Sequence, residues 1–186
     1  MKKLFYFTVV AIAVLFIAGC DNKKKTVEDG LEAPVEEQVA VVDSAVYGVI
    51  GAGTSMHSLE VKDENGKTSV FPLNVDLEAD LQGGLFSGDR ITLVLGKNAN
   101  GEKEVMKAVN LSSLCGKWTA LDRNFEIKDD GTVESAQSME SNPYTQWSMI
   151  NCRLVLNRDT FDVLYIGGDS LTIENLKGIF VYKRQK

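Results

Sequence analysis

The chain has 186 residues, of which 44% are apolar and 25% charged, which is the composition of an ordinary globular protein and excludes a membrane bundle or a fully disordered chain. Residues 1–19 read as a removable export signal, and loss of the positive charges of Lys2 and Lys3 takes the formal charge from −6 to −8. This acidic balance argues against wholesale binding to nucleic acid or to anionic lipid surfaces. The length of the mature chain fits one large or two small domains.

The export signal consists of Lys2 and Lys3, an apolar run from Leu4 to Ala18, and small residues before Cys20. The run is short for a membrane span, which needs about 20 apolar residues. The ending Ile17-Ala18-Gly19-Cys20 resembles the lipobox of bacterial lipoproteins. This resemblance implies cleavage before Cys20 and acylation of its thiol, so that the lipid bilayer becomes the partner of the mature N-terminus. The alternative is a plain N-terminal membrane anchor with an incidental cysteine.

Residues 20–45 are predicted to form a flexible tether, because residues 21–45 carry seven acidic and three basic residues and no aromatic one. The first strand could instead begin within Val39–Val42. Asp21, directly after Cys20, resembles an inner-membrane retention signal of enterobacteria, whereas surface-export signals occupy the positions of Asp21-Asn22-Lys23-Lys24-Lys25 in other bacteria. We expect a lipid-anchored protein of the cell envelope, at the outer rather than the inner membrane, with its orientation left open.

Residues 46–110 show the period-two alternation of β-strands, with hairpin turns predicted at Asn65-Gly66 and Asn100-Gly101. A piece from Asp76 to Gly88 interrupts them, and its leucines at spacings of four would suit one or two helical turns or a loop. Three strands, this interruption and two more strands resemble the OB-fold, a five-stranded barrel. We therefore expect an OB-like domain over residues 46–110.

OB-folds often bind nucleic acid through aromatic side chains and a basic face. Residues 46–110 contain six basic and nine acidic residues, and only Tyr47, Phe71 and Phe86 are aromatic. Nucleic acid is therefore not an expected partner.

Residues 111–186 are predicted to form seven or eight short strands in succession, with turns at Asp130-Gly131, Gly167-Gly168 and Lys177-Gly178. Such a succession is typical of an up-and-down antiparallel barrel. The expected fold class is thus all-β, with an OB-like barrel followed by a second, small barrel.

The opening Leu114-Cys115-Gly116-Lys117-Trp118, the meander of strands and the terminal Tyr182-Lys183-Arg184 resemble the lipocalin pattern, above all the small lipocalin-like lipoproteins of Bacteroidetes. The resemblance implies that a basic side chain packs across the ring of Trp118 and closes the barrel base. Arg184 matches this basic residue better than Lys183. The resemblance covers about 70 residues, and such short strands make a shallow barrel that side chains can fill.

Few residues suggest chemistry. Cys115 and Cys152 could form a disulfide in an oxidising compartment or remain free as small buried residues. His57 is the only histidine, so a metal site is not expected, and we expect His57 to lie in an exposed loop. No cofactor and no catalytic residue are predicted, because no nucleophile elbow or metallopeptidase motif occurs.

Several aromatic side chains of the second barrel could line a pocket for a hydrophobic molecule, although aromatic residues at strand spacing more often belong to the core. The candidate pocket residues are Trp118, Trp147, Phe161, Tyr165 and Tyr182. Tyr144 and Gln146 are expected to point outward, opposite to Trp147.

The expected function is that of a non-enzymatic, membrane-anchored envelope lipoprotein that binds a small hydrophobic ligand or an envelope protein. The alternatives are a structural or stress-sensing module with filled barrels, and an inhibitor or enzyme of cell-wall chemistry. A cavity inside the second barrel would favour ligand binding, and a continuous packed core would favour the filled module.

Overall fold

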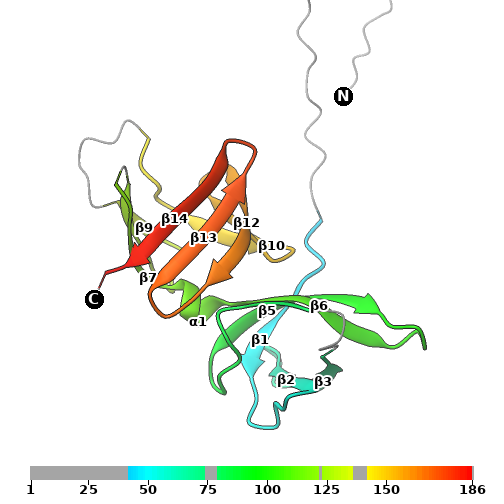
Figure 1. The fold of residues 1–186 in the computed structure, drawn as a ribbon. Helices are drawn as coiled ribbons and strands as arrows, with labels where there is room; N and C mark the ends of the chain where they lie inside the picture. The colour runs from blue at the N-terminus through cyan, green and yellow to red at the C-terminus, as the bar shows by residue number, and fades with distance from the viewer. Residues whose placement is uncertain (1–41, 74–78, 122, 136–141, 186) are drawn as a thin grey trace, which may run out of the picture. The chain divides into compact units, whose positions relative to one another are not determined.

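The computed structural model describes residues 42–73, 79–121, 123–135 and 142–185, and these residues belong to one compact unit. The predicted export signal, Cys20 and residues 20–41 of the predicted tether lie outside the described residues. The described chain is all-β apart from one helical turn, α1 (Leu111–Leu114), and its strands form two sheets (Figure 1). The predicted all-β class is confirmed.

The first sheet has six strands in the order β3-β2-β1-β5-β6-β4. Neighbouring strands pair antiparallel except β4, which runs parallel to β6. The end of β3 meets β6 again through a parallel bridge between Leu73 and Val105. The strands are β1 (Val46–Ile50), β2 (Ser58–Lys62), β3 (Thr68–Pro72), β4 (Asp80–Gln82), β5 (Arg90–Lys97) and β6 (Lys103–Asn110).

Both hairpin turns predicted in this sheet are present. Gly66 (φ 80°) and Gly101 (φ 81°) take up the left-handed backbone that the turns need. In each turn a side-chain oxygen, from Asp63 or from Asn98, accepts hydrogen bonds from two backbone amides further along the turn. Local chemistry therefore sets these turns, as the sequence indicated.

The interruption between Asp76 and Gly88 differs from the expectation of helical turns or a loop. In its described part, Asp80–Gln82 forms β4, and Leu81 packs against the core of the first sheet. The parallel ladder that β6 offers to this segment outweighs the helical spacing of its leucines.

The second sheet has eight strands, each paired antiparallel with a neighbour, in the order β10-β11-β12-β13-β14-β7-β8-β9. Figure 1 shows them in green through red. The strands are β7 (Gly116–Thr119), β8 (Asn124–Ile127), β9 (Val133–Ser135), β10 (Trp147–Ile150), β11 (Arg153–Leu156), β12 (Asp159–Ile166), β13 (Ser170–Asn175) and β14 (Gly178–Arg184).

This second sheet is a nearly closed barrel. The last strand, β14, pairs with the first, β7, so that Arg184 lies opposite Trp118. Between β9 and β10 the seam is held by a bridge from Thr132 to Gln146 and by flanking backbone hydrogen bonds of 2.9 Å. Closure of this kind leaves few unpaired strand edges that could aggregate.

Candidate functional site

The interior of the second barrel is the first place to look for the predicted ligand pocket. Trp118, Phe161 and Tyr182 are buried in one continuous cluster of apolar side chains, and Trp147 is partly buried against that cluster. The indole N–H of Trp118 donates to the carbonyl of Leu114 (2.9 Å), and that of Trp147 donates to the carbonyl of Lys128 (2.6 Å). Four of the five candidate pocket residues therefore belong to the packed core or its border.

A chain of aromatic rings runs through this core. Each contact is edge-to-face, with centroid separations of 5.0 to 6.5 Å, the arrangement in which ring quadrupoles attract. The rings, in order of contact, are Tyr182, Phe125, Tyr144, Phe161 and Phe180. Rings packed against each other in this way occupy the space that a ligand would need.

Tyr165 lies apart from the other candidate pocket residues, on the outer face of β12. Strict alternation from Phe161 and Val163 would turn it inward. A β-bulge between Val163 and Tyr165 inserts one residue into the register, so that Leu164 and Tyr165 are both exposed and Ile166 is buried again. The ring of Tyr165 instead lies over Gly167, where an added Cβ would come within 2.6 Å of the tyrosine hydroxyl oxygen.

Tyr144 is buried, and the expectation that it points outward is wrong, whereas Gln146 is exposed as expected. The expectation extended the alternation of β10 back to Tyr144, but the strand begins only at Trp147. The irregular segment before β10 turns the ring of Tyr144 inward, where Arg123 lies 4.3 Å from its centroid.

The structure brings Trp118 and Arg184 together at the base of the barrel. The guanidinium carbon of Arg184 lies 4.1 Å from the centroid of the Trp118 ring, in a cation–π contact. The same guanidinium donates hydrogen bonds to the carbonyls of Cys115 (2.9 Å) and Ser113. Burial lowers the pKa of Arg184 from its ordinary value, but an arginine remains charged at physiological pH.

The structure shows why the residue two positions before Trp118, Gly116, is a glycine. Its φ of 138° is one that side chains rarely adopt, and a Cβ at this position would collide with Nη1 of Arg184. The glycine therefore gives the guanidinium access to the carbonyl of Cys115.

Both cysteines of the described chain are free thiols; Cys152 is buried, as the second alternative expected, whereas Cys115 is only half-buried. Cys152 is fully buried, and its thiol lies 3.4 Å from the carbonyl oxygen of Thr92 in the first sheet. Burial raises the pKa of Cys152 to about 11. Burial also raises the pKa of the half-buried Cys115, although nearby Arg90 opposes this shift. Both thiols are therefore predominantly protonated at neutral pH, which makes them poor nucleophiles.

The last residues of the predicted tether are held in place rather than free. The side chain of Asn151, in the turn between β10 and β11, accepts from the amide of Ser44 (2.8 Å) and donates to the carbonyl of Val42 (3.0 Å). The carboxylate of Asp43 accepts from the amide of Asn151 (3.0 Å) and from the hydroxyl of Tyr47 (2.5 Å). Residues 42–44, which the sequence assigned to the tether, are thus held by contacts with the second sheet's β10–β11 turn.

These contacts shift the ionisation of both partners. Burial and the neighbouring carboxylate of Asp43 raise the pKa of Tyr47 well above its usual range. Slight burial raises the pKa of Asp43, but hydrogen bonds from Tyr47 and from two backbone amides outweigh this effect and hold the pKa below its ordinary value. The phenol therefore stays neutral and the carboxylate stays charged over the physiological range.

Neither of two surface hollows of about 500 Å³ assembles an evident reaction centre. A cleft of about 520 Å³ is lined by Arg153, Arg158, Asp159, Thr160, Asp162, Glu174, Asn175, Leu176 and Lys177. Two of its cations are already paired with its acids, Arg153 with Asp162 (2.9 Å) and Lys177 with Asp159 (3.3 Å). A groove of about 500 Å³ is lined by Gly83, Gly84, Phe86, Ser113, Ile166, Gly167, Gly168 and Arg184, where Arg184 already serves two carbonyls.

His57 is exposed in the loop between β1 and β2, as expected. Within the described ranges, no group of three or more His, Cys, Asp or Glu side chains is placed to hold a metal ion. Over the same ranges, none of the helical structure is long and apolar enough to cross a bilayer.

Comparison with known proteins identifies no relative: no family model, no curated protein and no solved structure matches the chain.

Proposed function

We propose that the protein is a non-enzymatic lipoprotein of the bacterial cell envelope, anchored through acylated Cys20, whose two filled β-domains act through their outer surfaces. The observation that carries this proposal is the continuous buried cluster in the second barrel. Its aromatic rings pack on one another at 5.0 to 6.5 Å, which favours a structural or sensing module over a carrier of a hydrophobic ligand.

We further propose that the two sheets are an OB-like and a small lipocalin-like domain. For the first sheet, support comes from the order β3-β2-β1-β5-β6 and from the parallel bridge of Leu73 to Val105, which together bring five strands towards a closed barrel. For the second sheet, support comes from the meander of eight strands and from the contact of Arg184 with Trp118.

The anchoring is proposed from the sequence Ile17-Ala18-Gly19-Cys20 after the apolar run. It is tested by labelling cells with a fatty-acid probe. The wild-type chain should carry the label and sediment with membranes, whereas Cys20→Ser should leave an unlabelled chain that is either soluble or an unprocessed precursor. A labelled Cys20→Ser chain would refute the proposal.

The absence of a ligand is tested by native mass spectrometry of the full chain purified from its host in mild detergent. The proposal predicts the mass of the acylated protein alone. A stoichiometric co-purifying molecule that is lost when Phe161 is enlarged to Trp would instead support a ligand carrier, because that change adds volume inside the barrel.

A further inference from the structure

Four apolar side chains are exposed together on the outer face of β12, β13 and β14. Ile179 and Val181 on β14 are each 60% exposed, and Tyr165 and Leu164 on β12 are 52% and 40% exposed. The register aligns Val181 with Thr172 and Thr172 with Tyr165, so these side chains form a row across three strands. We call this surface the outer β12–β14 face.

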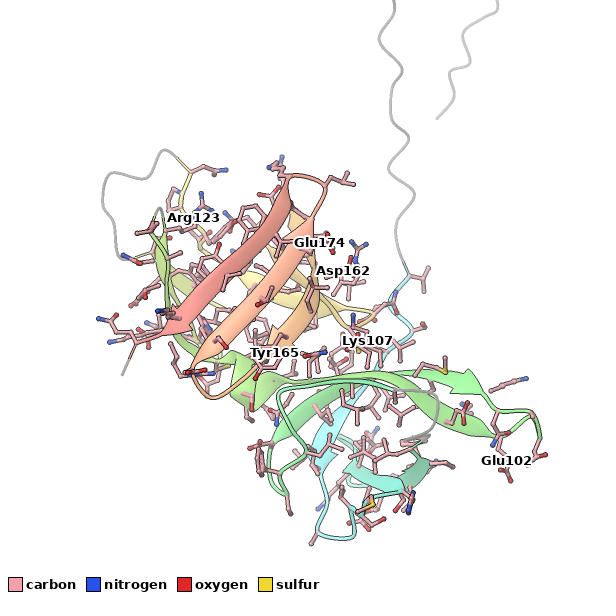
Figure 2. All side chains as sticks on the ribbon, viewed as in Figure 1. Glu102, Lys107, Arg123, Asp162, Tyr165 and Glu174 are labelled. Atoms are coloured by element: carbon pink, nitrogen blue, oxygen red, sulfur yellow. The ribbon has the colours of Figure 1, made fainter. Side chains whose placement is uncertain are left out.

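The outer β12–β14 face has opposite charges at its two ends. Glu174 lies beside Ile179 and Asp162 in the row on one side, and Lys183 lies beside Ser170 in the row on the other. Figure 2 shows Glu174 and Asp162 next to each other, with Tyr165 farther along the sheet.

Asp162 is already held by Arg153 through hydrogen bonds of 2.9 and 3.2 Å. Across residues 42–185, leaving aside the segments that the structure does not describe, Glu174 and Lys183 make no ion pair. One negative and one positive charge are thus left for a partner.

We propose that this face binds the same face of a second copy of the chain. A two-fold axis that lies between the two copies, parallel to the sheet and perpendicular to the strands, and that runs above the row of Thr172 and Val181, exchanges the two ends of the face. It sets Glu174 of each copy towards Lys183 of the other and places Val181 against its own counterpart. The pattern of charges is therefore self-complementary, as an interface with two-fold symmetry requires.

The small size of the face determines when it associates. The surface area of four partly exposed apolar side chains and their rim is smaller than the area that each partner buries in a standard stable interface, which is about 800 Å². Association is weak in free solution, and it becomes significant when both copies are confined to one membrane, since tethering raises the effective concentration towards the millimolar range. The inference rests on the proposed acyl anchor, because the anchor is what confines both copies to one membrane.

The test uses the full chain in membranes of its host, with Cys115→Ser to remove the half-buried thiol. Because the axis places Val181 opposite itself, Val181→Cys should form a disulfide-linked dimer under mild oxidation. Val70→Cys is the matched control, because Val70 is 58% exposed but lies on β3 in the first sheet, and it should stay monomeric. A dimer yield no higher than that of Val70→Cys would overturn the proposal, as would disulfide adducts of Val181→Cys with other proteins only.

A charge exchange supplies the second measurement. Glu174→Lys should lower the yield of Val181→Cys dimer by about three- to tenfold, because it replaces two attractions by two repulsions. The double change Glu174→Lys with Lys183→Glu should restore the yield. Failure of the double change to restore it would refute the two-fold arrangement.

Crosslinks are scored in the membrane and soluble fractions of the same cells. An anchored chain that forms no dimer refutes this inference and leaves the proposed anchor standing. A soluble chain that still forms the Val181→Cys dimer refutes the anchor and shows a contact that needs no tether. A soluble chain that forms no dimer refutes the anchor and, with it, the tether-dependent association.

Discussion

Replacing Arg184 by alanine removes the side-chain contacts that reinforce the backbone pairing of the last strand of the second barrel with the first. The substitution deletes the cation–π contact with Trp118 and the hydrogen bonds to the carbonyls of Ser113 and Cys115. It also opens a gap beside Trp118, which is fully buried. We therefore expect Arg184→Ala to lower the free energy of unfolding by more than is usual for a residue near the end of a chain.

The magnitude follows from these separate contacts. A hydrogen bond from a charged donor contributes about 1.5 to 3 kcal/mol and a partly desolvated cation–π contact about 1 to 2 kcal/mol. Because the three share one side chain and the carbonyls can be rehydrated, the losses are not additive. We expect Arg184→Ala to lower the free energy of unfolding by about 2 to 4 kcal/mol. Arg184→Lys should cost roughly half as much, since a lysine keeps the charge but not the planar fork that reaches two carbonyls.

The matched control is Arg153→Ala. Arg153 also makes two hydrogen bonds, but to the exposed carboxylate of Asp162, and an exposed ion pair contributes less than about 1 kcal/mol. Urea unfolding followed by tryptophan fluorescence gives both values, because Trp118 and Trp147 lie in this barrel. Equal losses for Arg184→Ala and Arg153→Ala would show that Arg184 does not close the barrel.

Three further predictions follow from other contacts. Thiol titration of the unfolded, acylated protein without reductant should find two free thiols, and a disulfide between Cys115 and Cys152 would contradict the structure. In the native protein, the half-buried Cys115 should react before the buried Cys152. The free energy of unfolding should fall as the pH rises above about 10, because the pKa of Tyr47 is higher in the folded than in the unfolded state. The contribution of the neutral Tyr47 phenol to stability is complete below about pH 10 and is lost as the pH rises further. Tyr47→Phe should flatten this fall in urea midpoints, and an unchanged slope would argue against the Asp43 contact. Asn151→Ala should expose residues 42–45 to limited proteolysis and cost about 1 to 2 kcal/mol, whereas protection equal to that of wild type would mean that these residues are held by other contacts.

The sequence alone predicted most strands of both sheets. The turns expected at Asn65-Gly66 and Asn100-Gly101 are present, and residues 111–186 form eight strands, at the upper end of the expected number. Alternation of apolar and polar residues and turn-forming glycines act over a few residues, so they can be recognised without knowing the partner strand. The positions of Trp118 and Arg184 were available only through the resemblance to a known pattern.

The structure also contains a turn that the sequence analysis missed. Asn151 and Cys152 both have positive φ, at 50° and 58°, and form the turn between β10 and β11 without a glycine. The only signal in the sequence was Asn151, a residue that tolerates this conformation better than most. The buried contact of Cys152 with Thr92, 60 residues away in the chain, helps to hold the turn.

What the sequence by itself determined is the all-β class, the turn chemistry and most strand positions, because these depend on neighbours within a few residues. Only the tertiary structure decided which aromatic rings lie inside the second barrel. A β-bulge places Tyr165 on the outer face of the barrel, and the irregular segment before β10 places Tyr144 in its interior. It also decided that Asp43 and Ser44 are held by Asn151, a partner more than a hundred residues away. Register shifts and such distant hydrogen bonds depend on which strands meet, and local periodicity does not contain that information.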